Sequence, residues 1–166
     1  MLTQEGRFWR AAPLIILAYS LQTTGLLSVH LGAATLDATF LLALCVAIEG
    51  GAARGALAGA GAGYLAGLSA MLHPGSLLAS RLVPCVLAGW LVSRWGRSNP
   101  FMPPILAALS ALLADGMFLL FSPNEWNLPY WSAHAPASML LHALAIWPAL
   151  WLVRWVVRPP KPLVFS

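Results

Sequence analysis

Residues 51–72 have the sequence GAARGALAGAGAGYLAGLSAML, which contains a single charged residue, Arg54. The stretch is long enough to cross a membrane as an α-helix. Glycine recurs at every fourth position, at Gly51, Gly55, Gly59, Gly63 and Gly67. Residues four apart lie on one face of a helix, so these glycines form a groove without side chains. Such a groove lets helix backbones approach closely, and in lipid this packing drives helix association. The stretch therefore predicts a transmembrane helix with one tightly packed face.

Two interpretations of this glycine ridge (Gly51, Gly55, Gly59, Gly63 and Gly67) are open from the sequence. In the first, the ridge packs against other helices of the same chain. In the second, it receives a helix of a partner subunit or of a second copy of the chain. Each interior glycine costs up to about 1 kcal/mol of helix propensity, so both interpretations require close contact along the ridge.

The composition of the whole chain is typical of a membrane protein. Of the 166 residues, 60% are hydrophobic and 8% are charged, whereas soluble domains have about 25% charged residues. The nine Lys and Arg residues are scattered, so they do not form the basic cluster that nucleic-acid binding requires. Both cysteines, Cys45 and Cys85, lie in apolar segments, which predicts buried thiols without a disulfide.

Apolar segments and turn residues predict an all-α integral membrane protein with six transmembrane helices in one domain, residues 1–166. Turn-forming residues separate most of the segments, as in His73–Ser76 and Arg97–Pro100. Each segment has nearly the length that a membrane-spanning helix needs. The predicted spans are residues 11–29, 31–48, 51–72, 77–93, 101–121 and 136–157.

The positions of the basic residues predict the orientation of these spans. With six spans, eight basic residues fall on one side, namely Arg7, Arg10, Arg54, Arg94, Arg97, Arg154, Arg158 and Lys161. The remaining one, Arg81, lies within the fourth span. Because short basic loops stay in the cytoplasm, we expect both termini to be cytoplasmic.

Ionisable residues inside predicted spans are costly and need a partner. By their positions in the spans, Asp37, Arg81 and Asp115 all fall in the outer third of the membrane. We expect Arg81 to pair with Asp115 or else with Asp37; in the alternative, Arg81 extends to the lipid headgroups. Together with His142, these residues form a predicted intramembrane polar cluster. No two histidines have the spacing of metal ligands on a helix, so we predict no metal site.

Enzyme motifs do not occur in the sequence. It contains no HExxH, GxSxG, Walker A or CxxC pattern, and its five carboxylates are not paired at short spacing. The loops are too short for a separate catalytic domain. We therefore expect a membrane protein that is not an enzyme and needs no cofactor.

A longer stretch around the glycine ridge follows a family pattern. Residues 41–68, LLALCVAIEGGAARGALAGAGAGYLAGL, combine an apolar run, a short turn and a span of the form G-x-x-x-G-F/Y-x-x-G-L. Residues 72–100 continue with a short turn, a span containing Gly89 and a basic turn. Over about residues 36–121 this pattern resembles the rod shape-determining protein MreD family. The matching motif positions are Gly59, Gly63, Tyr64, Gly67 and Leu68. The acid that this family often has after the Gly-Leu pair is replaced by Ser69-Ala70-Met71, so its role is not carried over.

The resemblance implies a non-catalytic scaffold of the cell-wall elongation machinery in the bacterial cytoplasmic (inner) membrane. Such a scaffold binds MreC, a protein with one membrane span, and helps to maintain rod shape. The wider assembly includes the glycosyltransferase RodA, a class B penicillin-binding protein and the MreB filament. The partner at the glycine ridge would be MreC or a second copy of the chain. This hypothesis rests on the unbroken ridge and expects no polar cavity.

The resemblance also implies a fold similar to the substrate-binding subunits of energy-coupling-factor transporters. This similarity supplies a second hypothesis, in which the chain is such a subunit of a vitamin or metal transporter. A subunit of this kind needs a few convergent polar groups in an outward-facing pocket. The candidates for that pocket are Asp37, Arg81, Asp115, Trp131 and His142.

Overall fold

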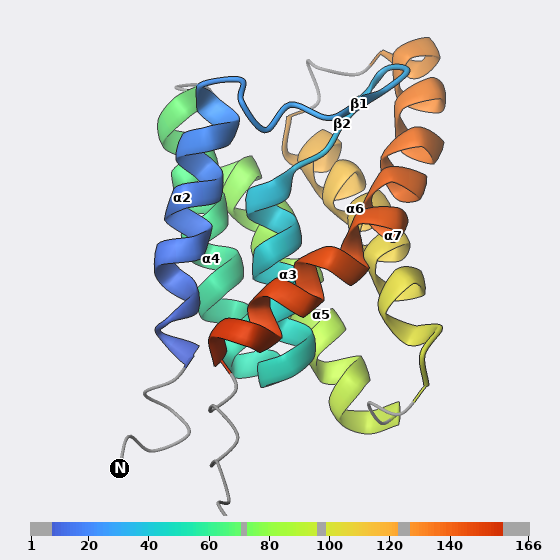
Figure 1. Ribbon diagram of the computed structural model, residues 1–166. Coiled ribbons are helices and arrows are strands. Elements are labelled where there is room, and N and C mark those ends of the chain that lie inside the picture. The colour runs from blue at the N-terminus through green and yellow to red at the C-terminus, as the bar shows by residue number, and fades with distance from the viewer. Residues whose placement is uncertain (1–7, 71–72, 96–98, 123–126, 158–166) are drawn as a thin grey trace, which may run out of the picture.

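The computed structural model describes residues 8–70, 73–95, 99–122 and 127–157. Within these ranges the chain is almost entirely helical, with one antiparallel hairpin near its beginning (Figure 1). The helices are α2 (Ala11–Thr23), α3 (Ala38–Gly50), α4 (Ala52–Ala70), α5 (Pro74–Trp95), α6 (Met102–Phe121) and α7 (Leu128–Val157). The strands are β1 (His30–Leu31) and β2 (Ala34–Thr35).

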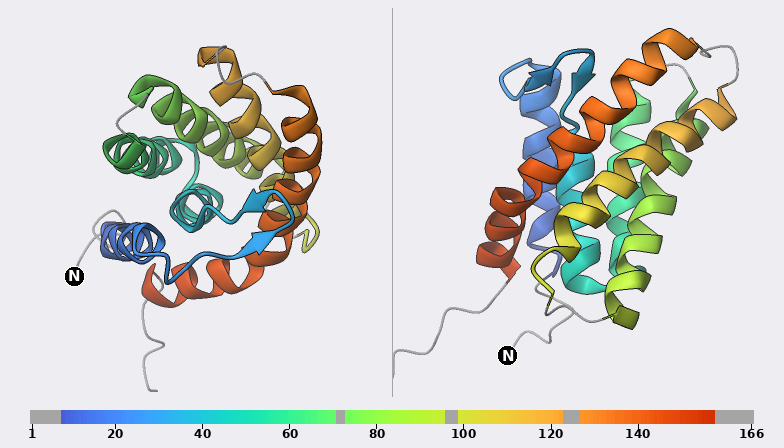
Figure 2. Two further views of the ribbon diagram at one scale, coloured as in Figure 1. Left: turned by 90° about the horizontal axis from the view of Figure 1, so that it is seen from above. Right: turned by 90° about the vertical axis from the view of Figure 1, so that its right-hand side faces the viewer.

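Helix α3 lies at the centre of the molecule, and α2, α4, α5, α6 and α7 surround it (Figure 2). Every residue from Ala38 to Ile48 is buried. A helix that is apolar on all sides is stable when other elements cover it all round. Asp37 caps its first turn, because its Oδ1 atom accepts a hydrogen bond from the backbone N–H of Phe40 at 2.9 Å.

Helices α4 and α5 pack against each other along the glycine ridge. A β-carbon added at Gly59 would lie 2.8 Å from the carbonyl oxygen of Arg81, which is closer than real β-carbons approach. Distances of 2.7 to 3.2 Å separate α5 from β-carbons added at three further ridge positions, Gly55, Gly63 and Gly67. The first interpretation, packing within the chain, therefore describes these four glycines. Helix α5 leaves no room on them for a partner helix.

Gly51 has a different role from the rest of the ridge. It lies at the tight connection between α3 and α4, with a φ of +83° that favours glycine. Its backbone is contacted by α5, since a β-carbon added at Gly89 would lie only 2.6 Å from the carbonyl carbon of Gly51. Two glycines thus allow the α3–α4 turn to rest directly on α5.

The start of the second predicted span is wrong. The sequence predicts a helix from residue 31, but residues 30–35 form the hairpin, in which His30 pairs with Thr35. Gly32 has a φ of +57° at the first position of the two-residue turn, as hairpin turns of the primed types require. Helix α2 also ends earlier than predicted, at Thr23 rather than residue 29, and Gly25 follows with a φ of +78°.

The last helix begins earlier than the predicted residue 136. It starts at Leu128, because the side chain of Asn127 accepts a hydrogen bond from the backbone N–H of Tyr130 at 3.3 Å. Pro129 lies in the first turn, where its missing N–H has no helical partner to lose. Pro136 and Pro148 lie inside the helix without ending it.

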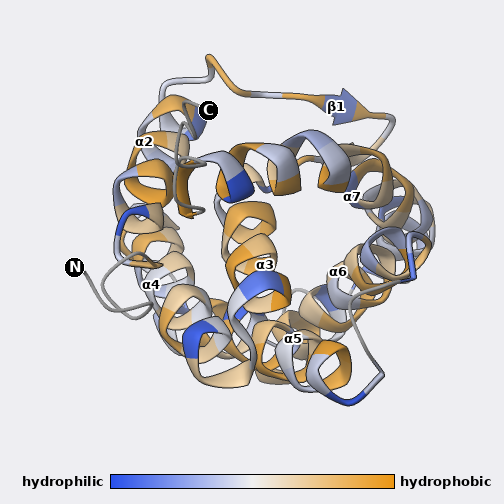
Figure 3. Cartoon of the chain, turned by 60° about the horizontal axis from the view of Figure 1, so that its bottom comes forward, coloured by the Kyte–Doolittle hydropathy of each residue, from blue (hydrophilic) through white to orange (hydrophobic). Residues whose placement is uncertain are grey.

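Among the described residues, α5, α6 and residues 129–157 of α7 are long and apolar enough to cross a membrane. Helices α2 and α3 are apolar but shorter. Large apolar side chains are exposed on several helices, for example Leu57, Trp151 and Trp155. Hydrophobic residues occur along all of the helices (Figure 3). An exterior of this kind is unfavourable in water and compatible with lipid.

Candidate functional site

A polar cavity of about 230 Å³ lies among the ends of several helices, next to the hairpin. Its charged and imidazole-bearing residues are Asp37, Arg81, Asp115, His134 and His142. They come from four parts of the chain: the residue before α3, α5, α6 and α7. The bundle thus brings together ionisable side chains that are far apart in the sequence.

All four residues of the predicted polar cluster line this cavity: Asp37, Arg81, Asp115 and His142. Trp131, which the transporter hypothesis adds to the pocket, does not line it. The scaffold hypothesis expects no polar cavity, and that expectation is wrong. The shared depth of the ionisable residues in the predicted spans therefore predicted four of the five charged or imidazole-bearing residues that line the cavity.

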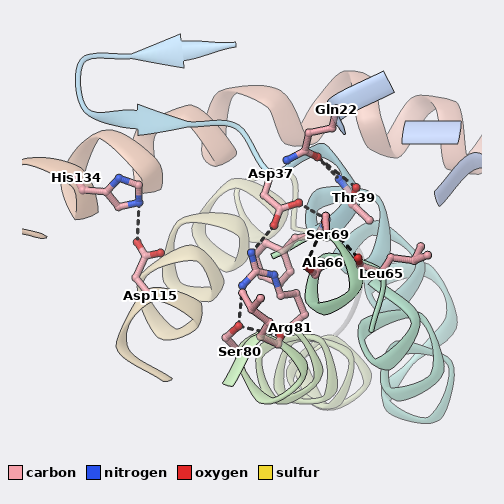
Figure 4. Close-up of polar contacts among 12 residues, drawn as sticks. Gln22, Asp37, Thr39, Leu65, Ala66, Ser69, Ser80, Arg81, Asp115 and His134 are labelled. Atoms are coloured by element: carbon pink, nitrogen blue, oxygen red, sulfur yellow. Dashed lines mark hydrogen bonds and ion pairs between the residues drawn. The ribbon is translucent and has the colours of Figure 1, made fainter. Parts of the chain in front are cut away.

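Arg81 pairs with Asp37, the second of its two predicted partners. The Nη2 atom of Arg81 donates to Oδ2 of Asp37 at 2.7 Å, and its Nη1 atom donates to the Ser80 hydroxyl, also at 2.7 Å (Figure 4). Both charged side chains are largely buried, with 18% and 20% of their surface exposed. Because Asp37 also caps α3, this pair connects α5 to the start of the central helix.

Asp115 lies beside His134, so its predicted pairing with Arg81 is wrong. Its Oδ2 atom is 3.7 Å from Nε2 of His134 (Figure 4). On the other side of the ring, Nδ1 lies 3.2 Å from the carbonyl oxygen of Ala33 in the hairpin. A hydrogen bond to this carbonyl needs the proton on Nδ1, because a carbonyl can only accept. The Tyr130 hydroxyl lies 3.3 Å from the same Nδ1 atom and can donate to it in the other tautomer, in which Nε2 donates to Asp115.

His134 was not part of the predicted cluster, because the sequence places it before the last helix. Since α7 begins at Leu128, His134, Ser138 and His142 lie on one face at spacings of four residues. All three line the cavity. That spacing is a signal in the sequence, but it identifies the face only once the helix is known to start early.

His142 is the most deeply buried of the ionisable residues in the cavity, with 3% of its surface exposed. Its Nδ1 atom lies 2.8 Å from the carbonyl oxygen of Ser138, so Nδ1 carries the proton and Nε2 of the neutral ring has a lone pair. In the described part of the chain, Nε2 has no hydrogen-bond partner, and the same holds for the buried atoms Asp115 Oδ2 and Arg81 Nε. Three polar atoms without a partner thus belong to residues that line one cavity.

A second ion pair, between Arg154 and Glu49, lies outside this cavity. Nε of Arg154 donates to Oε1 of Glu49 at 2.5 Å, which joins the end of α7 to the last turn of α3. Neither residue lines the polar cavity. The central helix is therefore held at both ends by ion pairs to surrounding helices.

An apolar groove of about 490 Å³ lies on the outside of the α4–α5 pair. Tyr64, Gly67, Leu68, Pro74, Gly75 and Leu78 line it. Among the described residues, a β-carbon added at Gly75 would meet nothing within 4 Å, so they leave the groove open there. Within the glycine-rich motif, Tyr64 and Leu68 are therefore exposed beside the groove, whereas Gly67 is buried against α5.

Comparison with known proteins adds no relative, since no protein family, curated protein or solved structure matches this chain. Within the described part of the chain, no three His, Cys, Asp or Glu side chains are grouped closely enough to hold a metal ion. The described residues thus form two candidate sites, the polar cavity and the apolar groove.

Proposed function

We propose that the protein is a non-catalytic scaffold of the MreD type, which binds MreC and helps to maintain rod shape. The observation that supports this proposal is that different residues of the glycine-rich motif form the α4–α5 contact and the exposed apolar surface. Gly59 and Gly63 bring the backbones of α4 and α5 together, whereas Tyr64 and Leu68 remain 63% and 53% exposed. One motif both builds a helix pair and leaves an apolar surface beside it.

The proposal includes the six-span arrangement with both termini in the cytoplasm of a bacterial cell. Helices α5, α6 and α7 have the length and hydropathy for this arrangement, and the buried α3 would cross within the ring that they help to form. A fold similar to the substrate-binding subunits of energy-coupling-factor transporters is part of the same proposal. RodA, the class B penicillin-binding protein and MreB would be reached through MreC.

The apolar groove is the surface that we assign to the single span of MreC. Gly75 leaves part of the groove free of side chains, so a partner helix could approach the backbone closely there. Tyr64 and Leu68 would then pack along one side of the bound helix. A second copy of the chain is the competing occupant, and the oligomeric state of the purified protein distinguishes the two.

Co-purification with MreC from detergent extracts tests the proposal. We expect Gly75→Leu to reduce the recovery of MreC at least tenfold without changing the thermal stability, because the added side chain enters open space in the groove. Gly61→Leu is the matched control, since Gly61 is exposed on α4 with nothing within 4 Å of an added β-carbon and does not line the groove. Equal recovery of MreC with Gly75→Leu and with the unchanged chain would rule out this surface.

The polar cavity favours one second candidate, the substrate-binding subunit of a vitamin or metal transporter. In that case the α4–α5 surface would dock the membrane coupling protein of the transporter. Recovery of a transporter ATPase and coupling protein, rather than MreC, with the purified chain would support this candidate. Recovery of MreC without the ATPase and the coupling protein would exclude the transporter candidate.

A further inference from the structure

We propose that the polar cavity binds a small zwitterion of amino-acid size, with its ammonium group at Asp115 and His142 and its carboxylate at Arg81. This binding activity goes beyond the scaffold function and does not depend on MreC. It is argued from the charges, hydrogen-bonding capacity and size of the cavity.

The charges of the cavity leave one acidic group without a close cation. Arg81 and Asp37 offset each other at 2.7 Å, whereas among the described residues Asp115 forms its one ion-pair contact with the imidazole of His134 at 3.7 Å. With neutral imidazoles, the lining carries one negative charge in excess. The ammonium group of a ligand would pair directly with Asp115, as buried charges usually are paired. Because the ligand's carboxylate would share Arg81 with Asp37, the site as a whole would keep one negative charge.

The hydrogen-bonding capacity near Asp115 also calls for a donor. Asp115 Oδ2 is a buried acceptor without a partner, and His142 Nε2 is a second one because the Ser138 carbonyl fixes the tautomer of that ring. Buried polar atoms without a partner cost about 1–3 kcal/mol each, so such atoms are rarely left unsatisfied. An ammonium group has three donors and no acceptor, which fits two acceptors from neighbouring helices.

At Arg81 the cavity needs a hydrogen-bond acceptor instead of a donor. The guanidinium group donates to Asp37 and Ser80 through its Nη atoms, and its Nε–H is buried without an acceptor. A carboxylate oxygen of the ligand would accept this third hydrogen bond, which is strengthened by the charge on both partners. The cavity thus has donor and acceptor ends that match the two ends of a zwitterion.

The size of the cavity limits the rest of the ligand. Its volume of about 230 Å³ is below the ~300–1,000 Å³ of pockets for drug-sized molecules. Phe40, Ala111 and Ala114 provide the apolar part of the lining. The ring of Phe40 packs edge-on against His142 at 5.9 Å between centroids, which holds the imidazole in place. A ligand with a short apolar side chain fits this space.

Calorimetric titration of the purified full-length protein tests the proposal with four zwitterionic probes, glycine, L-alanine, D-alanine and L-serine. Ethylamine and propionate are the matched probes, because each keeps only one charged end of alanine. We expect saturable binding of at least one zwitterion and at least tenfold weaker binding of ethylamine and propionate. Absence of saturable binding for all four zwitterions in folded protein would overturn the proposal, as would equal binding of either one-ended probe.

Variants connect the binding to the cavity. Asp115→Asn removes the charge, and Arg81→Lys keeps a cation for Asp37 but lacks the Nε–H. We expect each to weaken binding at least tenfold, whereas Glu49→Gln in the distant ion pair leaves it unchanged. If Asp115→Asn fails to fold, Arg81→Lys provides the same test, and unchanged affinity in a folded variant overturns the proposal. Zwitterion binding without MreC recovery would refute the scaffold function alone.

Discussion

The Nη2 atom of Arg81 lies 2.7 Å from the Oδ2 atom of Asp37, while the other carboxylate oxygen of Asp37 caps the central helix. One side chain thereby positions the start of α3 and neutralises a largely buried cation on α5. The two effects reinforce each other, because the cap orients the carboxylate towards Arg81. Removing this carboxylate should therefore affect the whole bundle.

We expect Asp37→Ala to lower the free energy of unfolding by about 3 kcal/mol or more. The substitution leaves Arg81 without its partner in a largely buried position and also removes a helix cap worth about 1 kcal/mol. Asp37→Asn keeps an oxygen for the cap and should cost less than Asp37→Ala. Unfolding in mixed micelles of increasing SDS content, followed by circular dichroism, measures both. A loss below 1 kcal/mol for Asp37→Ala would show that the pair contributes little.

The α4–α5 contact provides a prediction with an internal control. Gly59→Ala places a β-carbon 2.8 Å from the Arg81 carbonyl oxygen and should destabilise the protein by roughly 1–3 kcal/mol, since the helices must separate. Gly61→Ala, on the open side of the same helix, should be neutral or stabilise by up to about 1 kcal/mol. The same SDS titration compares them. Equal effects would mean that the two helices are not in backbone contact.

The two cysteines report on the integrity of the core. Cys45 and Cys85 have no exposed surface, so a maleimide reagent should modify neither in the folded protein. Both should react after unfolding in SDS, which mass spectrometry detects as two added labels. Modification of either thiol within minutes in mild detergent would indicate a looser helix bundle.

Because the native thiols are buried, single new cysteines can test the proposed topology. Ala33→Cys places a thiol on the exposed hairpin, and Arg94→Cys places one near the exposed end of α5. In intact cells, an impermeant maleimide should label the variant at position 33 from outside. The variant at position 94 should react only after the membrane is permeabilised. The opposite pattern would reverse the proposed orientation.

The four-residue spacing of the glycines predicted that α4 has a close helix neighbour. The sequence did not predict how the helices are arranged around α3. The four-residue spacing of the ridge requires a close helix neighbour, and α5, the next helix in the chain, is that neighbour. Depth in the membrane placed Arg81, Asp37 and Asp115 in one layer, but it could not say which acid lies beside Arg81. That choice depends on how the helices are arranged around α3.

Local backbone geometry explains the elements that the sequence did not predict. Apolar composition favoured a helix from residue 31, but Gly32 with positive φ and the cap at Asp37 make residues 30–35 a hairpin. Pro136 suggested a helix start, whereas the start is set by Asn127 and Pro129. In both cases one polar side chain at a helix terminus outweighed the hydrophobic pattern.

The central helix has 13 residues, which at 1.5 Å per residue gives a length of about 20 Å. A bilayer core is about 30 Å thick, so α3 alone is too short to cross it, and the backbone next to the helix would complete the span. Irregular backbone is tolerated there where protein surrounds it or water reaches it. Because the other helices surround α3 and all of its residues from Ala38 to Ile48 are buried, lipid does not contact this short helix. The mismatch between its length and the bilayer is therefore absorbed inside the protein, and the longer α5, α6 and α7 set the thickness that the protein presents to the membrane.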